Sequence, residues 1–348
     1  MPRMTTIRDV AKRAGVSIAT VSRVMNGSTF VSEPLQERVW QAIRELNYSP
    51  SALAQGLSTH VSRTIGVIVP SITKHPFWAQ VVAGIEDACR GEGYNLFLCH
   101  SDANVQRERD YLQLLRTRRV DGVIIGPATE TSEHLQGILS EDWPVVAVDG
   151  HFVDRAIPCI TVDNYHAAYA ATAYLTSLGH RRIGVLSGPA SHSVSMERLR
   201  GYRDALSAVG APVRPDLERI CPFDDEAARQ AIHQFFAAPE PPTALFCLIG
   251  RWARVVLAAL RQQGKAIPDG VSLLTFDDLE WMALVSPPLT AIAQPAVEMG
   301  RQAIGMLFGI LRQTEPAAPT QVVLETTFAP RASCAPPAEP SIGAGGAL

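Results

Sequence analysis

The spacing of apolar residues changes once along the chain, near residue 60. Before that point, apolar positions recur every three or four residues, as they do on one face of a helix. Gly15 and the segment Asn26-Gly27-Ser28 interrupt this spacing and are suited to turns. The pattern predicts a small all-α unit with N-caps at Thr6 and Ser17. Its three short helices are expected at residues 7–14, 18–25 and 33–46.

From Arg63 onward, short apolar runs alternate with stretches of helical pattern. Strands are predicted at residues 65–69, 96–99, 123–125, 145–148, 183–186, 244–248 and 271–276, and helices between them include 81–90, 107–117 and 167–178. This alternation is typical of parallel sheets covered by helices on both faces. Because one sheet would hold about half of the strands, the sequence predicts two similar α/β lobes. The Pro-, Ala- and Gly-rich segment 334–348 is expected to be a disordered tail.

Charge is distributed unevenly between these two regions. Residues 1–60 carry seven Lys and Arg against four Asp and Glu, a net charge of +3, whereas the whole chain has −3 and the remainder therefore −6. A basic head on an acidic body indicates that the head is the part that meets a polyanion such as DNA.

The chain lacks the motifs of common enzymes and metalloproteins. It contains no GxSxG, HExxH or GxxxxGK[ST] segment, and its nine histidines are dispersed. The six cysteines include no CxxC pair: Cys89, Cys99, Cys159, Cys221, Cys247 and Cys334. We therefore predict no catalytic residues, metal or cofactor. The sequence also has no membrane-length apolar run and no signal peptide, which predicts a cytoplasmic protein and disfavours an exported transport-type binding protein.

The first two predicted helices, joined by a glycine turn, form a helix-turn-helix unit, whose second helix enters the DNA major groove. Its outward positions are Ile18, Ala19, Ser22 and Arg23. Arg23 can form two hydrogen bonds with guanine, and Ile18 and Ala19 can pack on a thymine methyl group. Ser17 and the amides at the helix start are placed for a phosphate. Periodicity alone is equally compatible with a generic three-helix bundle that has a solvated polar face.

The order and identity of the residues favour the helix-turn-helix unit. The segment TIRDVAKRAGVSIATVSRVMNGSTFVSE, followed by ELNYSPSALAQGL, is similar to the headpiece and hinge of the LacI/GalR family of bacterial transcriptional regulators. The resemblance implies a sequence-specific DNA-binding regulator, most simply a repressor. Residues 1–47 would be the headpiece, and residues 48–62 a hinge that becomes helical on DNA.

The same resemblance implies a set of DNA contacts made by a homodimer on a pseudo-palindromic operator. The recognition helix would span Ser17–Asn26, with Ile18 and Ala19 at the positions that vary with operator sequence. Leu57 matches a leucine that wedges into the minor groove, where it partly unstacks a base step and kinks the duplex. The expected contact residues are Thr6, Ser17, Ile18, Ala19, Thr20, Ser22, Arg23, Asn26, Tyr48, Ser51 and Leu57.

The resemblance continues at lower density to about residue 330, through RVDGVIIG, LGHRRIGVLSGP, ERLRGYRDAL and PPLTAIAQP. It implies a periplasmic-binding-protein-like core at 63–333, with three crossovers near Val162, Ala293 and Leu324. Lobe one would comprise about 63–161 and 294–323, and lobe two about 162–292 and 324–333. A small-molecule effector, a sugar or sugar derivative, would bind between the lobes, change their orientation and so control operator affinity.

Six residues match effector-contacting positions of the family: Phe77, Trp78, Asp149, Arg198, Phe223 and Asp277. Two further candidates are His192, at a loop position that binds ligand in purine-sensing relatives, and Arg251, which could reach an anionic ligand. Arg198 matches an arginine that binds ligand hydroxyls or a carboxylate, and Asp277 an acid that accepts hydrogen bonds from hydroxyls. The aromatic residues could instead belong to a core, and either aspartate could cap a helix.

One segment departs from the family. After PTALFC, where an Asn/Asp-Asp pair is usual, this chain has Ile249-Gly250, followed by Arg251 and Trp252. His192 and Val194 also differ from the residues of purine-sensing relatives, which disfavours a purine corepressor. Two possibilities stay open: a different ligand, such as an anion within reach of Arg251, or an effector-independent regulator with a degenerate cleft.

Overall fold

The computed structural model describes residues 5–25, 31–48, 61–140, 142–313 and 320–338. The chain forms two compact units, residues 1–62 and residues 63–348. The boundary between them coincides with the change in apolar spacing.

The headpiece part of the N-terminal unit contains three helices: α1 (Ile7–Ala14), α2 (Ile18–Met25) and α3 (Glu33–Glu45). They lie where the helical spacing predicts them. Val10, Val21 and Val39, one from each helix, are fully buried at the centre of the unit. Each buried valine stabilises the unit by about 1.5–3 kcal/mol relative to an exposed one.

Both predicted N-caps are present, at the starts of α1 and α2. Thr6 and Asp9 form a reciprocal capping box at the start of α1. Gly15 ends α1 with φ 64°, a left-handed conformation that glycine adopts without steric cost. Ser17 Oγ then accepts a hydrogen bond from Thr20 N at 3.1 Å, which caps α2.

Lobe one contains a six-stranded sheet in the order β11-β5-β4-β3-β1-β2, and all its neighbouring strands are parallel. Its strands are β1 (Thr64–Val69), β2 (Asn95–His100), β3 (Gly122–Ile125), β4 (Val145–Val148), β5 (Cys159–Val162) and β11 (Gln321–Leu324). Helices α5 (Pro76–Gly91) and α11 (Ala296–Arg312) cover one face. Helix α6 (Val105–Thr117) and the 3-10 turn η1 (Glu133–Leu135) cover the other.

Lobe two contains a second six-stranded sheet, in the order β12-β10-β9-β8-β6-β7, with only β12 antiparallel to its neighbour. Its strands are β6 (Ile183–Ser187), β7 (Glu218–Ile220), β8 (Ala244–Cys247), β9 (Ser272–Phe276), β10 (Thr290–Ala293) and β12 (Thr327–Ala329). Helices α7 (Asn164–Ser177) and α8 (Ser193–Ala208) cover one face, and α9 (Asp225–Ala237) and α10 (Ala253–Gln262) the other. Short 3-10 turns are η2 (Pro215–Leu217), η3 (Gly250–Trp252) and η4 (Glu280–Ala283).

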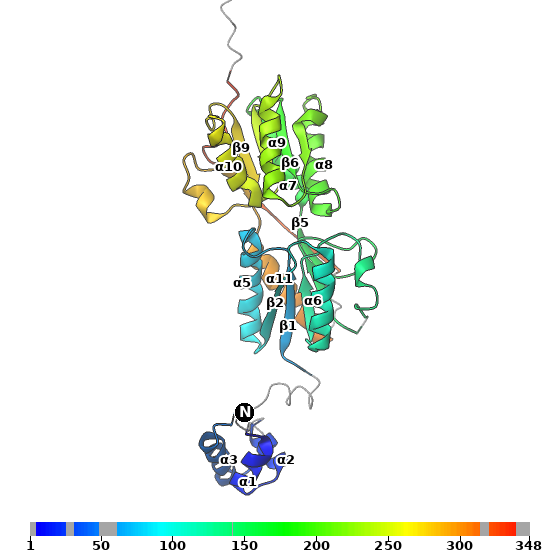
Figure 1. Ribbon diagram of the computed structural model, residues 1–348, viewed down its shortest axis with the longest axis vertical. Coiled ribbons are helices and arrows are strands. Elements are labelled where there is room, and N and C mark those ends of the chain that lie inside the picture. Colours follow the sequence, from blue (N-terminus) through cyan, green and yellow to red (C-terminus); the bar gives the residue numbers. More distant parts are fainter. Residues whose placement is uncertain (1–4, 26–30, 49–60, 141, 314–319, 339–348) are drawn as a thin grey trace, which may run out of the picture. The chain divides into compact units, whose positions relative to one another are not determined.

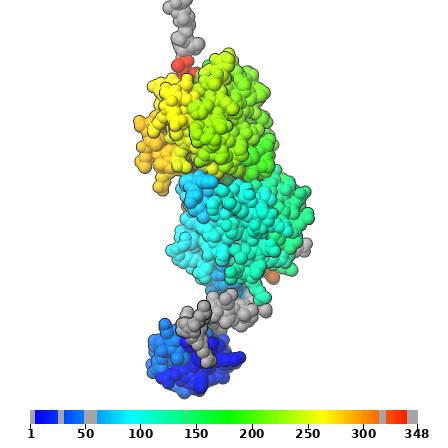
Figure 2. All heavy atoms as spheres, in the orientation of Figure 1, coloured from blue at the N-terminus to red at the C-terminus, as the bar shows by residue number. Residues whose placement is uncertain are grey.

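The chain passes between the two sheets three times: after β5, after β10 and after β11. These passages lie directly after Val162, Ala293 and Leu324, the positions inferred from the sequence. The lobes are drawn as two separate layered bodies in the ribbon view (Figure 1), and in the space-filling view the blue-cyan residues of lobe one meet the green and yellow residues of lobe two along one boundary (Figure 2). The core is therefore two α/β lobes joined by three connections.

All seven predicted apolar runs form strands, but β5, β7 and β10–β12 were not predicted. They are short, and some lie at sheet edges, where one side of a strand meets solvent and a full apolar run is not required. In β7, for example, Glu218 and Arg219 are partly exposed.

The expectation of a disordered tail from residue 334 is wrong for its first residues. Ser272 Oγ accepts a hydrogen bond from Ala335 N at 3.0 Å, and His180 Nε2 lies 2.9 Å from Ala335 O. These bonds attach the chain after β12 to lobe two. Residues 339–348 lie outside the described residues.

Within the described ranges, no helix is both long and apolar enough to cross a bilayer.

Candidate functional site

Helix α2 presents its predicted reading face to the outside of the headpiece. Ile18 is 45% exposed, and Ala19 and Arg23 are also exposed, whereas Val21 and Val24 point into the core. An apolar side chain such as Ile18, left in water on a short helix, is suited to a partner surface that includes methyl groups. Ser17, Thr20 and Ser22 lie on or beside the same face.

The other predicted DNA-contact residues are distributed differently. Thr6 is exposed, and its hydroxyl is engaged in the capping box with Asp9. Tyr48 is half-buried and packs against the headpiece core. Asn26, Ser51 and Leu57 lie outside the described residues.

A cleft lies between the two lobes of the core, with an empty volume of about 730 Å³ including its mouth. Its lining comes mainly from segments that follow strands: Ser71 after β1, Asp102 after β2, Asp149 after β4, Phe223 after β7, Arg251 after β8 and Gln294 after β10. This is where open α/β sheets bind ligands. Its size is within the range of small-molecule sites.

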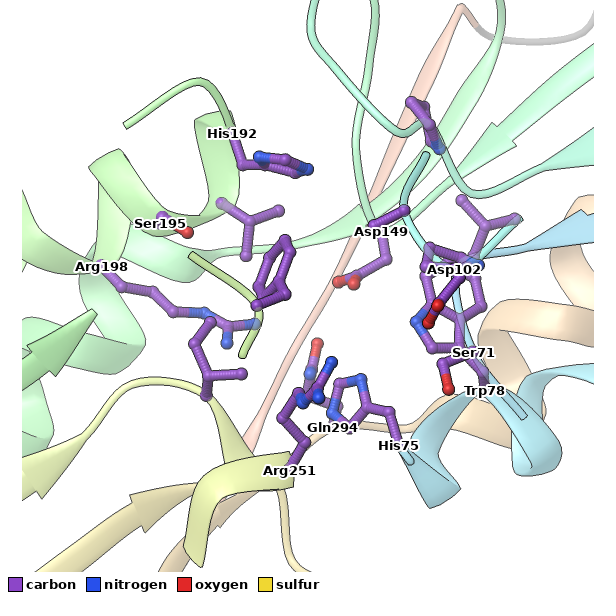
Figure 3. Close-up of a pocket in the computed structure, with 17 residues that line it drawn as sticks. Ser71, His75, Trp78, Asp102, Asp149, His192, Ser195, Arg198, Arg251 and Gln294 are labelled. Atoms are coloured by element: carbon purple, nitrogen blue, oxygen red, sulfur yellow. The ribbon is translucent and has the colours of Figure 1, made fainter. Parts of the chain in front are cut away.

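The lobe-one wall carries Ser71, His75, Trp78 and Asp102, with Asp149 facing Arg198 across the cleft (Figure 3). Trp78 was expected at this wall and lines it. Phe77 was also expected there, but it is 2% exposed, belongs to the lobe-one core and does not line the cleft. Both residues lie in the first turn of α5, where successive side chains point in different directions. Phe77 packs edge-on against Trp78, with ring centroids 5.3 Å apart.

Arg198 enters the cleft from α8 on the lobe-two wall and is 2% exposed. Its Nε donates to Asn164 Oδ1 at 2.8 Å and its Nη1 to Leu248 O at 2.7 Å, while its guanidinium lies 3.4 Å above the ring of Phe276. Burial lowers the pKa of Arg198, and the nearby Asp277 and Asp149 partly oppose that effect. Its Nη2 is buried and has no hydrogen-bond partner in the described part of the chain.

Asp149 follows β4 with φ 58°, which aims its carboxylate into the cleft. Burial raises its pKa to about 6; Arg198 acts to lower the pKa, and the negative charge of Asp277 acts to raise it further. Its Oδ1 is buried without a partner among the described residues. Asp149 is therefore an available acceptor beside a buried arginine.

Asp277 is placed differently from the expectation. It follows β9 with φ 63°, is 2% exposed and does not line the cleft. Its Oδ2 lies 2.9 Å from His75 Nε2, and its Oδ1 accepts a hydrogen bond from Gln294 Nε2 at 2.5 Å. Burial alone would raise the pKa of Asp277, but these hydrogen bonds and the charges of His75 and Arg198 outweigh it and lower the pKa to about 2.

The His75–Asp277 contact joins lobe one to lobe two, because His75 precedes α5 and Asp277 follows β9. We call it the interlobe latch. Gln294, which also binds Asp277, lies in a crossover between the lobes. Asp277 thus holds the lobes together in this structure, with its oxygens occupied by protein donors.

Gly250, part of the segment that departs from the family, contacts the latch residue Asp277. Gly250 N donates to Asp277 Oδ2 at 3.2 Å. A Cβ at this position would lie 2.5 Å from the same carboxylate oxygen and 2.5 Å from Phe276 O. Any residue larger than glycine would therefore displace Asp277, so the His75–Asp277 contact requires glycine at position 250.

The remaining predicted effector residues line the lobe-two side of the cleft. His192 packs edge-on against Phe223, with ring centroids 5.0 Å apart, and burial lowers the pKa of His192, which favours its neutral form. Arg251 is 9% exposed, and its Nη2 donates to Asp225 Oδ1 at 3.0 Å. Its Nε is buried and makes no hydrogen bond within the described segments.

The sequence did not identify His75, Ser195, Asn164 or Gln294. His75 and Gln294 form the latch with Asp277, Asn164 orients Arg198, and the buried Ser195 lines the cleft. One signal was available: a polar residue directly after a strand, as at Gln294, marks the ligand edge of such a sheet. Nothing in the sequence marks His75, because its role depends on a residue about two hundred positions away.

No group of three His, Cys, Asp or Glu side chains able to hold a metal ion occurs in the residues that the structure describes.

Comparison with known proteins identifies this combination of headpiece and cleft. Residues 6–51 match the family model described as bacterial regulatory proteins, lacI family. Residues 62–329 match the model described as periplasmic binding proteins and sugar binding domain of LacI family. The chain belongs to the LacI family.

Individual relatives agree with this assignment over most of the chain. The HTH-type transcriptional repressor PurR of Photobacterium profundum is 36% identical over 306 residues, 87% of this chain and 91% of the relative. The crystal structure of the lac repressor dimer bound to operator and the anti-inducer ONPF aligns with a TM-score of 0.84 and 26% identity, covering 96% of this chain and all of the other. The transcriptional regulator CelR in complex with cellobiose aligns with a TM-score of 0.69 and 30% identity, covering 94% of this chain and 99% of the other.

This LacI-family protein is therefore a helix-turn-helix transcriptional regulator. Membership of a family of transcriptional regulators confirms the prediction that the chain is not an enzyme. The predicted fold class is confirmed as well: a helical headpiece followed by two parallel α/β lobes.

Proposed function

We propose that the chain acts in the cytoplasm as a homodimeric repressor, in which two α2 helices read the half-sites of a pseudo-palindromic operator. A hydroxylated effector, a sugar or sugar derivative, would bind in the interlobe cleft and set operator affinity. The observation that carries the effector part is the pair of buried, unsatisfied groups that face each other there, Arg198 Nη2 and Asp149 Oδ1. Buried polar groups in folded proteins almost always have partners, so this pair favours a bound polar molecule.

In the DNA complex, Ile18 and Ala19 would contact thymine methyl groups and Arg23 a guanine. Ser17, Thr20, Ser22 and Thr6 would bind bases or phosphates near the start of α2, and Tyr48 the backbone beside the hinge. Asn26, Ser51 and Leu57 keep the roles that the family resemblance gives them. The exposure of Ile18, Ala19 and Arg23 on one helix supports this arrangement.

In the effector complex, a neutral ring would stack on Trp78 or Phe223, and its hydroxyls would bond Asp149 and Arg198. The complex of the relative CelR with cellobiose supports a saccharide in this fold. A change in lobe orientation would reach DNA through residues 48–62. Such coupling is typically about 1–3 kcal/mol, a several-fold to hundredfold change in operator affinity.

A direct test starts by selecting operators from a random duplex pool with the full-length protein. We expect two inverted half-sites, and fluorescence anisotropy should then show an affinity change when the right sugar is added. Recovery of a single unpaired half-site would contradict the dimeric arrangement. Hypoxanthine, included as a purine control, is expected to leave operator affinity unchanged.

A second candidate is an effector-independent repressor with a degenerate cleft. The observation that favours it is the replacement of polar residues by Ile249-Gly250, together with the occupied oxygens of Asp277. Under this alternative the selected operator would bind tightly, and no sugar, sugar acid, sugar phosphate or purine would alter the affinity or the melting temperature.

A further inference from the structure

The cleft contains two buried arginines with guanidinium nitrogens that are unpaired among the described residues, and a neutral ligand would supply neither with an anionic partner. Arg198 and Arg251 both reach it from lobe two, are 2% and 9% exposed, and each keep one buried guanidinium nitrogen without a partner in the described chain, Nη2 and Nε respectively. An unpaired buried guanidinium nitrogen is costly, because burial removes its water and nothing replaces it.

Neither nearby carboxylate, Asp277 or Asp149, neutralises Arg198 through a hydrogen bond. Within the described residues Arg198 forms no ion pair; an amide and a carbonyl oxygen are its acceptors. Asp277 is held by His75 and Gln294, and burial raises the pKa of Asp149 to about 6. The cleft therefore lacks a carboxylate that is hydrogen-bonded to Arg198.

Arg251 is paired with only one carboxylate, and that one faces solvent. Asp225 has a side chain 46% exposed, whereas the side chain of Arg251 is 8% exposed. Water screens such a half-exposed partner, so it offsets little of the cost of burying the arginine. The planar guanidinium fork of Arg251 thus stays suited to an oxyanion in the cleft.

Two acceptors that could serve ligand hydroxyls also line the cleft: Asp149, which follows β4 in lobe one, and Gln294, in the crossover after β10. Asp149 Oδ1 and Gln294 Oε1 are buried and unpartnered in the part of the chain that is described. A ligand that fits all of these groups carries both an oxyanion and hydroxyl groups.

We propose that the effector is an oxyanion-bearing polyol, a sugar carboxylate or sugar phosphate, whose anionic group is bound by Arg251 together with Arg198. This rests on the proposed effector-controlled function and gives the chemical class of the ligand. Arg251 is then a specificity-determining residue, at the position where this chain departs from its family.

The test uses full-length protein and matched ligand pairs: D-glucose with D-glucuronate and D-glucose 6-phosphate, and D-galactose with D-galacturonate. Isothermal titration calorimetry gives the dissociation constants, and operator affinity by anisotropy is measured in the same buffers. We expect the charged member of at least one pair to bind roughly ten- to hundredfold more tightly than the neutral sugar, as for hydrogen bonds to charged groups. The carboxylate and phosphate arms decide which oxyanion is preferred.

Three variants connect that preference to Arg251. Arg251→Gln should remove this preference and leave binding of the neutral sugar unaffected. Arg254→Gln, at an exposed arginine in α10 directly after the η3 turn that carries Arg251, should change neither. Because Arg251→Gln could disturb folding, Asp225→Asn provides a second measurement. It removes the competing carboxylate without touching the arginine, and it should tighten binding of the acid about two- to fivefold.

The outcomes separate this proposal from the proposed function. Neutral sugars that bind as tightly as their acids and alter operator affinity would overturn the oxyanion and leave effector control standing. Acid binding that survives Arg251→Gln and ignores Asp225→Asn would overturn the role of Arg251. An operator-binding protein that ignores every ligand would overturn effector control and the oxyanion together.

Discussion

The headpiece and the interlobe cleft present functional groups in opposite ways. On α2 the candidate contact residues lie within one short helix and point into solvent, and Ile18 is 45% exposed. In the cleft they come from segments between Ser71 and Gln294, and Arg198 is 2% exposed. A DNA-reading surface needs only a correctly capped helix, whereas the cleft needs two lobes, three crossovers and a latch to be in place.

The difference predicts how each region responds to substitution. Headpiece changes should alter DNA binding with little effect on the core, because the two units are separately compact. Cleft changes should alter folding and binding together, because buried polar groups there share partners.

The largest expected effect is at the latch. Gly250→Ala would force a methyl group to within 2.5 Å of Asp277 Oδ2 and Phe276 O, so we expect a loss of about 2–4 kcal/mol in the free energy of unfolding. Urea unfolding followed by circular dichroism measures it. Gly305→Ala in α11 is the matched control: a Cβ there meets nothing within 4 Å, and the change should stabilise the core by about 0.5–1 kcal/mol. Equal stability of the two variants would contradict the conclusion that the latch requires glycine at position 250.

The next effect is at the reading face. Arg23→Ala should weaken binding to the selected operator about ten- to hundredfold, as expected for one bidentate arginine–guanine contact of about 1–3 kcal/mol, and relax the preference at one base pair. The melting temperature of the core should not change. Arg44→Ala on α3 removes the same charge from an exposed position away from α2, and it should leave base preference intact. Identical losses for both variants, on operator and random DNA alike, would reduce Arg23 to a general electrostatic contact.

A smaller effect concerns Asp149 and depends on pH. Burial raises its pKa from 3.8 to about 6, so the folded protein keeps a proton that the unfolded chain releases between about pH 4 and 6. The free energy of unfolding therefore decreases as pH rises through that window. Asp149→Asn cannot ionise, so relative to wild type it should gain about 1–2 kcal/mol at pH 7 and almost nothing at pH 3.5. A difference that does not vary with pH would mean that Asp149 titrates normally.

The smallest effect distinguishes a cap from a DNA contact. Ser17→Ala should cost about 1 kcal/mol of headpiece stability, because Thr20 N loses its acceptor. Amide hydrogen exchange of α2 measures this loss. Ser17→Asp keeps an acceptor and should protect the same amides, yet its charge should repel a DNA phosphate and weaken operator binding. If Ser17→Asp bound DNA as tightly as wild type, Ser17 would act as a cap only.

By itself, the sequence determined what depends on neighbouring residues. The capping box at Thr6, the left-handed turn at Gly15 and the cap at Ser17 each follow from a few consecutive positions, and the structure contains all three. The seven apolar runs of the core also form strands; six of them are buried on both faces, which requires a mainly apolar sequence, and the seventh, β2, is an exposed edge strand. The family resemblance added the prediction of which of these elements contact a ligand.

Only the tertiary structure decided the roles that depend on distant partners. Phe77 and Trp78 are adjacent, aromatic and both buried in the lobe-one core, but only Trp78 also lines the cleft. Asp149 and Asp277 each follow a strand in the left-handed conformation; one keeps an unpartnered oxygen in the cleft and the other holds His75 in the latch. The physical reason is that burial and hydrogen-bond partners belong to positions in space, and residues far apart in the sequence supply them.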